Sequence, residues 1–289
     1  MSYQYKHNKH IYLNKKKAAF NIAIIAVRSL YKEISLSYKP GLVSFEDSGS
    51  HTDMDAKTFI KSIFSLRNYF KKIALAGINA ESFKSLQILG LEAEKNMLKA
   101  TLGINTHKGA IFSLGILCAA VGLLYGKRMS INAKNLSSII SFQWGKDILQ
   151  NNENVKSNGL NVKKKYGYQG ARYEAANGFL SISELALPYF KSTLDKSDDE
   201  NNSLIQTLFI LMKNIDDTNV LHRGGEDGLE FVKNSSSYFL KNGGVFNKNW
   251  KDEIKSLHRK FISKNISPGG SADLLALCYF VFKIEKESL

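Results

Sequence analysis

The chain has 289 residues, of which 44% are hydrophobic, and carries a formal charge of +14. This composition supports a real core, and the charge permits polyanionic partners (nucleic acid, anionic membrane or phosphate-rich small molecules) without selecting one. Cys118 and Cys278 lie in apolar runs, so a disulfide framework or zinc site is excluded. No secretion signal is evident, and the apolar run 110–125 is shorter than the about 20 residues of a membrane span. We therefore expect a cytoplasmic protein.

Long segments with helical periodicity dominate the chain, and alternating strand-like runs are scarce. We predict an all-α fold, a single-domain multi-helix bundle around buried central helices. Residues 1–17 are polar and basic and are predicted to form a partly ordered N-terminal arm, whereas residues 18–289 form the helical domain.

The first predicted helix covers residues 18–35, and Pro40 stops it because proline biases the preceding residue away from helical geometry. The loop up to Asp55 then carries an unusual density of oxygen and imidazole groups, among them His51, Asp53 and Asp55. Such a cluster suits ligand binding at the entrance to the next helix. Alternatively, Asp53 or Asp55 is simply a helix N-cap.

Helices are predicted over 55–76, 79–102 and 110–125, and the last of these is apolar on all sides, as a buried central helix is. The turn before it, GINTHKG, ends at Gly109 and contains Thr106, His107 and Lys108. Backbone N–H groups at a helix start, beside such side chains, form an anion site. The alternative is an ordinary capped turn with solvent-facing side chains.

Ser130 is predicted to cap a helix that runs to about residue 150, and the polar stretch 151–169 is predicted to be a flexible loop or lid. The segment GARYEAANGF opens a helix that ends at Leu187, before a proline. Its Arg172 and Glu174 stand among small residues, which allow a ligand to approach. A buried Arg–Glu pair is the alternative.

The stretch 204–225, LIQTLFILMKNIDDTNVLHRGG, is predicted to be a buried helix followed by a polar cluster of Asp216, Asp217, Asn219, His222 and Arg223. Two adjacent carboxylates at the mouth of a buried helix favour a divalent cation. The alternative is that the aspartates cap a turn which the double glycine ends.

Helices near 228–241 and 250–264 follow, and the segment ISPGGSAD then opens an apolar helix over 274–282. Gly269, Gly270 and Ser271 before a helix start suit a phosphate or another anion. An N-cap formed by Ser271 would explain the pattern equally well without a ligand.

Five segments, taken together, resemble the triphosphoribosyl-dephospho-CoA synthases in order and separation over residues 20–285. They are KPGLVSFEDSGSHTDMD, GINTHKGAIFSLG, GARYEAANGF, IDDTNVLHRGG and ISPGGSADLLA. Tyr173, where the family pattern has glycine, and the Phe45-Glu46 pair depart from it. The resemblance implies an all-α enzyme that transfers the triphosphoribosyl group of ATP to the ribose 2′-hydroxyl of 3′-dephospho-CoA and releases adenine. The product is the precursor of the prosthetic group of the citrate lyase or malonate decarboxylase acyl carrier protein.

This reaction passes through an oxocarbenium-like transition state, so the triphosphate must be held, adenine protonated and the attacking hydroxyl deprotonated. We predict that Asp53, Asp55, Asp216 and Asp217 hold Mg²⁺ on the triphosphate. The candidate acid–base groups are His51, His107, Asp217 and His222. The predicted substrate-binding residues are Lys39, Thr106, Lys108, Gly109, Arg172, Glu174, Asn219, Arg223, Gly269, Gly270 and Ser271.

Two other classes of protein remain open from the sequence. A helical Mg²⁺-dependent hydrolase of nucleotide ribosyl or phosphate bonds would use the same carboxylates with water as nucleophile. A nucleic-acid-binding protein would fit the charge, but the lysines are dispersed and no recognised motif occurs. We expect no nucleic-acid or membrane partner, and we consider a downstream holo-carrier-protein transferase as a candidate partner.

Overall fold

The computed structural model describes residues 2–150, 162 and 165–287, with side chains from Leu13 onward. The described residues form helices and no strand, which confirms the all-α prediction. The α-helices are α1 (Ser2–Ser35), α2 (Ala56–Ile78), α3 (Phe83–Ala100), α4 (Lys108–Gly126), α5 (Ala133–Gln150), α7 (Ala171–Ala176), α8 (Leu187–Ser197), α9 (Glu200–Asn214), α10 (Thr218–Lys241), α11 (Trp250–Ser263) and α12 (Gly269–Lys286).

Helix α4 is the centre of the bundle, as its uniformly apolar sequence predicts. It is the one helix in the described part of the chain with the length and hydropathy of a membrane span, and 78% of it is buried by other helices. Helix α2 packs against it closely because Gly122 has no side chain: a Cβ there would lie 2.2 Å from the carbonyl oxygen of Ala74. The apolar run is thus a core helix.

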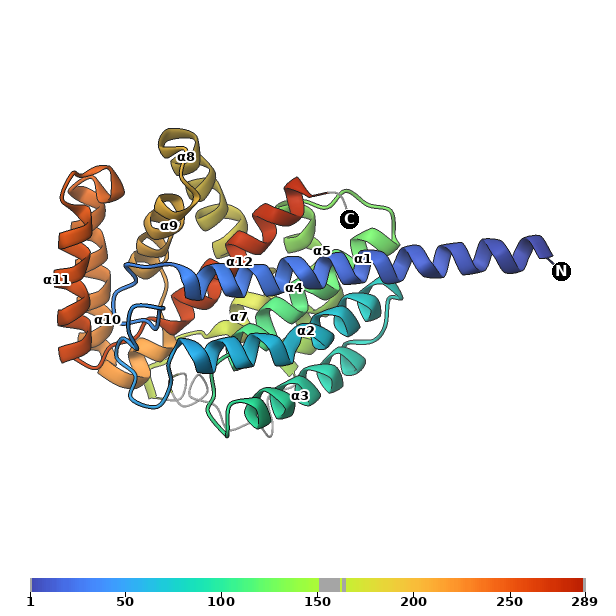
Figure 1. Ribbon diagram of the computed structural model, residues 1–289, viewed down its shortest axis with the longest axis horizontal. Coiled ribbons are helices and arrows are strands. Elements are labelled where there is room, and N and C mark those ends of the chain that lie inside the picture. The colour runs from blue at the N-terminus through green and yellow to red at the C-terminus, as the bar shows by residue number, and fades with distance from the viewer. Residues whose placement is uncertain (1, 151–161, 163–164, 288–289) are drawn as a thin grey trace.

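The remaining helices surround α4 unevenly. Figure 1 shows α1 running across the bundle, α2 and α3 on one side of it, and α8 to α11 gathered at the end away from the N-terminus. The N-terminal turns of α1 project beyond the other helices. Residues 1–17 were predicted to be a partly ordered N-terminal arm; residues 2–17 belong to α1, and no glycine or proline interrupts them.

Several predicted boundaries are wrong for local reasons. Ser130 is not the cap of α5, because Asn132 accepts the backbone N–H of Asn135. The helix expected to run to Leu187 is instead α7, a turn, a π-helical segment η1 (Ser181–Ala186) and then α8. Pro188 lies in the first turn of α8, where the missing N–H of proline is harmless.

The double glycine does not end a helix. Helix α10 continues through it, with a kink at Gly225, whose φ of 62° and ψ of −159° interrupt the helical geometry. A further short 3₁₀ segment, η2 (Gly244–Phe246), precedes α11. Most of the polar stretch 151–169, predicted to be a loop or lid, lies outside the described residues.

Candidate active site

The starts of α10 and α12 are joined by one carboxylate. Asp217 is the N-cap of α10, and its Oδ1 accepts the backbone N–H groups of Asn219 at 2.9 Å and Val220 at 3.4 Å. Its Oδ2 accepts both the backbone N–H of Ser271, at 2.8 Å, and the Ser271 hydroxyl, at 3.0 Å. Ser271 lies within α12, whose N-cap is Pro268, so the prediction that Ser271 is the N-cap is wrong.

Asp217 has little capacity for further ligands. It is 1% exposed, and burial raises its pKa although the hydrogen bonds from Ser271, Asn219 and Val220 act in the opposite direction. A carboxylate with both oxygens occupied by protein donors is a structural clamp in this state. Gly270 is needed beside it, since a Cβ there would lie 2.9 Å from Oδ1.

The neighbouring Asp216 points elsewhere. Its Oδ1 lies 2.5 Å from Nζ of Lys233, in a partly exposed ion pair on α10. The two adjacent aspartates therefore face different surroundings.

Asp55 is the N-cap of α2 and accepts the backbone N–H and hydroxyl of Thr58, which bears out the capping alternative. Among the described residues, no group of three or more His, Cys, Asp or Glu side chains is arranged to hold a metal ion.

His51 connects the loop 41–55 to α10 and to the segment before α12. Arg223 donates from its guanidinium to His51 Nδ1 at 3.1 Å, and His51 Nε2 lies 2.9 Å from the Ser267 hydroxyl. Since Nδ1 is the acceptor, Nε2 carries the proton. Burial and the charge of Arg223 lower the pKa of His51, whereas Asp53, 3.6 Å away, raises it. His51 is thus held in the neutral form.

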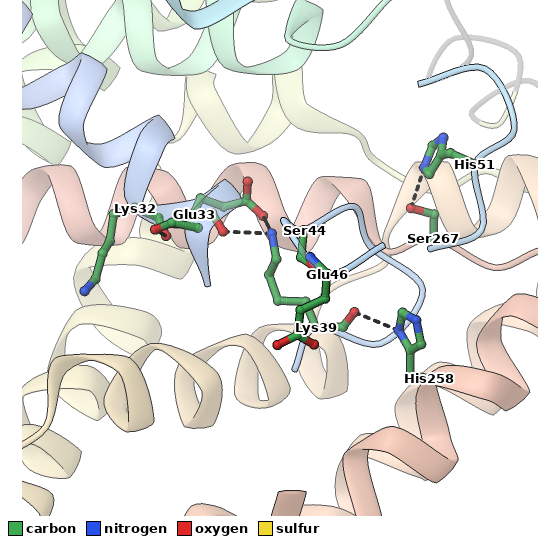
Figure 2. Close-up of polar contacts among 9 residues, drawn as sticks. Lys32, Glu33, Lys39, Ser44, Glu46, His51, His258 and Ser267 are labelled. Carbon is green, nitrogen blue, oxygen red and sulfur yellow. Dashed lines mark hydrogen bonds and ion pairs between the residues drawn. The ribbon is translucent and has the colours of Figure 1, made fainter. Parts of the chain in front are cut away.

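Arg223 uses several of its donors within the protein. It also donates to the Ser50 carbonyl and to Asn265 Oδ1, each at 2.9 Å. The guanidinium joins three separate segments, and this cross-link positions the loop 41–55 beside the start of α12. Figure 2 shows His51 and Ser267 meeting at this junction.

The other two predicted histidines differ sharply. His107 is the N-cap residue of α4, is 3% exposed, and its Nδ1 lies 2.6 Å from the Ser62 hydroxyl. Burial lowers its pKa to about 3, so the imidazole is neutral at physiological pH. His222 is exposed on α10. The three histidines are therefore not one cluster.

Asp273, on α12, was missing from the predicted site residues. Its carboxylate lies against the start of α4, because a Cβ at Gly109 would be 2.0 Å from Asp273 Oδ2. The residue is partly exposed, and burial, followed by the charges of Glu33 and Asp217, raises its pKa to about 8. One sequence signal was present: this carboxylate stands alone within an otherwise apolar helix, ADLLALCYFVF.

Lys39 is buried rather than available for substrate. Its ammonium lies 2.6 Å from Glu33 Oε1 and 2.7 Å from the Glu33 carbonyl oxygen, and its side chain is 0% exposed. Figure 2 shows this pair, with Lys32 of the same helix pointing away from it. A separate cavity of about 250 Å³ adjoins Lys39 and is bounded by the loop around Glu46 and by His258 of α11.

The remaining predicted residues lie around the same helix starts. Lys108 pairs with Glu94 at 2.6 Å, and the buried hydroxyl of Thr106 has no hydrogen-bond partner among the described residues. Gly269 faces Asn219, since a Cβ there would lie 2.9 Å from Nδ2 of that amide.

The segment 170–174 lies at the edge of this region. Gly170 approaches Thr218, since a Cβ on this glycine would lie 3.5 Å from the threonine methyl group. Glu174 accepts hydrogen bonds from the backbone and hydroxyl of Ser181, so it caps η1 rather than pairing with a ligand. Arg172 is half-buried, and burial lowers its pKa.

Comparison with known proteins gives a consistent result. A protein-family model described as ATP:dephospho-CoA triphosphoribosyl transferase matches residues 19–289. A probable 2-(5″-triphosphoribosyl)-3′-dephosphocoenzyme-A synthase of Acinetobacter calcoaceticus is 39% identical over 283 residues, which cover 98% of this chain and 97% of the relative. Proteins of the same description from Photobacterium profundum and Salmonella gallinarum are 36% and 35% identical, covering 91% and 94% of this chain and 87% and 93% of the relatives. No solved structure matches significantly.

Proposed function

This chain belongs to the ATP:dephospho-CoA triphosphoribosyl transferase family, and we propose that it transfers the triphosphoribosyl group of ATP to the ribose 2′-hydroxyl of 3′-dephospho-CoA, with release of adenine. The observation that carries this proposal is the convergence of motifs far apart in the sequence. Asp217 contacts Ser271, Asp273 contacts Gly109, and Arg223 contacts His51. One region therefore combines helix starts with ionisable groups.

The start of α4 is the best candidate for the phosphate-binding end of the site. Asp217 accepts backbone N–H groups near the starts of α10 and α12, whereas at α4 the N-cap residue His107 makes no side-chain cap hydrogen bond and Asn105 Oδ1 accepts the N–H of Lys108 at 3.2 Å. Free N–H groups at a helix start attract anions through their partial positive charge. Lys108 begins this helix, and its partly exposed ammonium could exchange Glu94 for a phosphate.

The reaction breaks the C1′–N9 bond of ATP and forms a C1′–O2′ bond to dephospho-CoA. The electron pair of the broken bond leaves with adenine, which then takes a proton, while the attacking hydroxyl loses one. Exclusion of water from the bound substrates favours this exchange, because water is the competing nucleophile. We infer that the protein contributes positioning of both nucleotides and proton transfer.

Mg²⁺ is proposed to enter with ATP. The four predicted carboxylates do not fit a shared protein site, because Asp217, Asp55 and Asp216 are occupied by Ser271, Thr58 and Lys233 respectively. Asp53, 61% exposed beside His51, is the member that a phosphate-bound ion would reach first. Mg²⁺ commonly takes one or two carboxylates in addition to substrate phosphates.

We further propose that the product becomes the prosthetic group of the acyl carrier protein of citrate lyase or malonate decarboxylase, through a downstream holo-carrier-protein transferase. These substrates imply a cytoplasmic location. The carrier can be identified by offering the purified product and a transferase to each apo-carrier protein, and measuring the mass increase. Modification of neither carrier would contradict this part of the proposal.

The central test is a product analysis. Purified protein is incubated with ATP, Mg²⁺ and dephospho-CoA, and adenine is quantified by chromatography while the coupled product is identified by mass. We expect adenine and triphosphoribosyl-dephospho-CoA in equal amounts, and neither when dephospho-CoA is omitted. Adenine with free ribose triphosphate in that control would indicate a nucleotide hydrolase instead.

A further inference from the structure

Asp273 differs from every other acidic group at the three helix starts in having no hydrogen-bond partner among the described residues. Because Gly109 has no side chain, Oδ2 of Asp273 lies directly over the first turn of α4. Asp217, in contrast, accepts hydrogen bonds from both α10 and α12. A carboxyl group that is largely surrounded by protein, yet unpaired and still reached by solvent, is typical of proton transfer rather than of structural support.

The charged groups around Asp273 favour its protonated form. Glu33 from α1 and Asp217, the N-cap of α10, both act on it with negative charge, and its contact with α4 is at Gly109, next to Lys108, whose ammonium is paired with Glu94. Glu33 is itself paired with the buried ammonium of Lys39. Together with burial, these charges place the pKa of Asp273 at about 8, so this carboxyl group retains its proton at neutral pH.

We propose that Asp273 is the catalytic acid that protonates adenine as it leaves ATP, an assignment that rests on the function proposed above. The C1′–N9 bond breaks, its electron pair goes to adenine, and the carboxyl proton of Asp273 goes to a ring nitrogen of the departing base. The 2′-hydroxyl of dephospho-CoA forms the new bond to C1′ and releases its proton to solvent. Solvent then returns a proton to Asp273, so the protons balance over one turnover.

The groups predicted from the sequence are less suited to this role. His51 accepts from Arg223 through Nδ1 and contacts Ser267 through Nε2, so both nitrogens are engaged. His107 is neutral, with a pKa of about 3, and therefore a weak proton donor. Both oxygens of Asp217 accept hydrogen bonds. Asp273 alone among these groups combines a retained proton with an unoccupied carboxyl.

The first experiment measures adenine release as a function of pH in wild type and in Asp273→Asn. For wild type, kcat/KM should fall as pH rises through about 8, because the deprotonated carboxylate cannot donate. The variant should lose about 100-fold or more in kcat at pH 7, the usual contribution of a general acid, and its remaining activity should lack this alkaline decline. Asp195→Asn, on the exposed surface of α8, is the matched control and should behave as wild type.

A substrate with an activated leaving group separates acid catalysis from a structural effect. ATP methylated at N7 carries a positive charge on its base, which leaves as a neutral molecule without needing a proton. Asp273→Asn should therefore regain activity to within about 10-fold of wild type on this analogue, since the 100-fold contribution of the acid is no longer needed. Equal impairment of the variant on ATP and on the analogue would overturn the assignment.

If Asp273→Asn fails to fold, the wild-type enzyme alone can still test the assignment of Asp273 as the acid. The alkaline decline should be present with ATP and absent with N7-methylated ATP, and a decline with both substrates would overturn the assignment. These outcomes are distinct from failure of the proposed function, in which wild-type protein releases no adenine from ATP in the presence of dephospho-CoA.

Discussion

Asp217, the N-cap of α10, and Asp273, near the start of α12, have opposite surroundings. The region around Asp217 is closed: one carboxylate accepts four hydrogen bonds and joins α10 to α12. The region around Asp273 is open: its carboxyl lies over Gly109 of α4 with no partner among the described residues. The same residue type therefore serves as a structural link in one place and as a reactive group in the other.

The difference shows how hydrogen bonding separates the two roles. Removing a carboxylate from water costs several kcal/mol unless protein donors replace the lost water, and Asp217 receives those donors from two helix starts. Asp273 receives none and faces Glu33 and Asp217 instead, so it retains its proton. The closed region stabilises the fold that holds the open region in place.

The largest effect is expected at the buried ion pair beside the open region. Lys39→Met leaves Glu33 buried without its partner and should lower the free energy of unfolding by about 3–5 kcal/mol, measured by urea denaturation at pH 7. Lys72→Met breaks an exposed pair with Glu92 and should cost less than about 1 kcal/mol. Equal losses for the two variants would mean that burial of Lys39 does not matter.

Removal of the closed link should come next. Asp217→Ala deletes the N-cap of α10 and the acceptor for Ser271 on α12, and we expect a loss of about 3 kcal/mol in unfolding free energy. Asp199→Ala is the matched control, because Asp199 caps only α9 and should cost about 1 kcal/mol. The prediction is contradicted if the two aspartates are worth the same.

The open region should respond in the opposite direction. The folded-state pKa of Asp273 is raised to about 8, so the stability linked to its proton is complete below the unfolded-state pKa of about 3.9 and is lost as pH rises through 8. At pH 8.5, Asp273→Asn should have a higher unfolding free energy than wild type, by about 2 kcal/mol after allowance for solvent access, as measured by urea denaturation. This advantage should disappear near pH 4. If the difference in unfolding free energy between the variant and wild type is the same at pH 4 and pH 8.5, the ionisation of Asp273 is not linked to stability.

The smallest effect is expected at Asp216, which lies outside both regions. Its ion pair with Lys233 is partly exposed, so Asp216→Asn should change stability by less than about 1 kcal/mol. Adenine release at saturating Mg²⁺ should remain within about twofold of wild type, as is usual for a surface substitution. A large loss of activity that higher Mg²⁺ restores would instead support the predicted metal role of Asp216.

The fold class and the central helix could be read from the sequence because hydrophobic periodicity is a local property. The apolar run 110–125 predicted a buried helix, and α4 occupies that position. The five motifs likewise indicated the family, which the comparisons confirm. The prediction that a helix ends before Pro188 is wrong, because Pro188 lies in the first turn of α8. Proline is common both after a helix and in the first turn of one, so the local sequence does not distinguish the two cases.

What the sequence alone determined was therefore the fold class, the central helix and the family. Tertiary structure decided which side chains in the five motifs are free. Asp216 and Asp217 are adjacent in sequence, yet one pairs with Lys233 and the other with Ser271, 54 positions away. Asp273 acquires its character from Gly109, Glu33 and Asp217, all distant in the chain. Charge and hydrogen bonding depend on neighbours in space, and only the packing of helices supplies those neighbours.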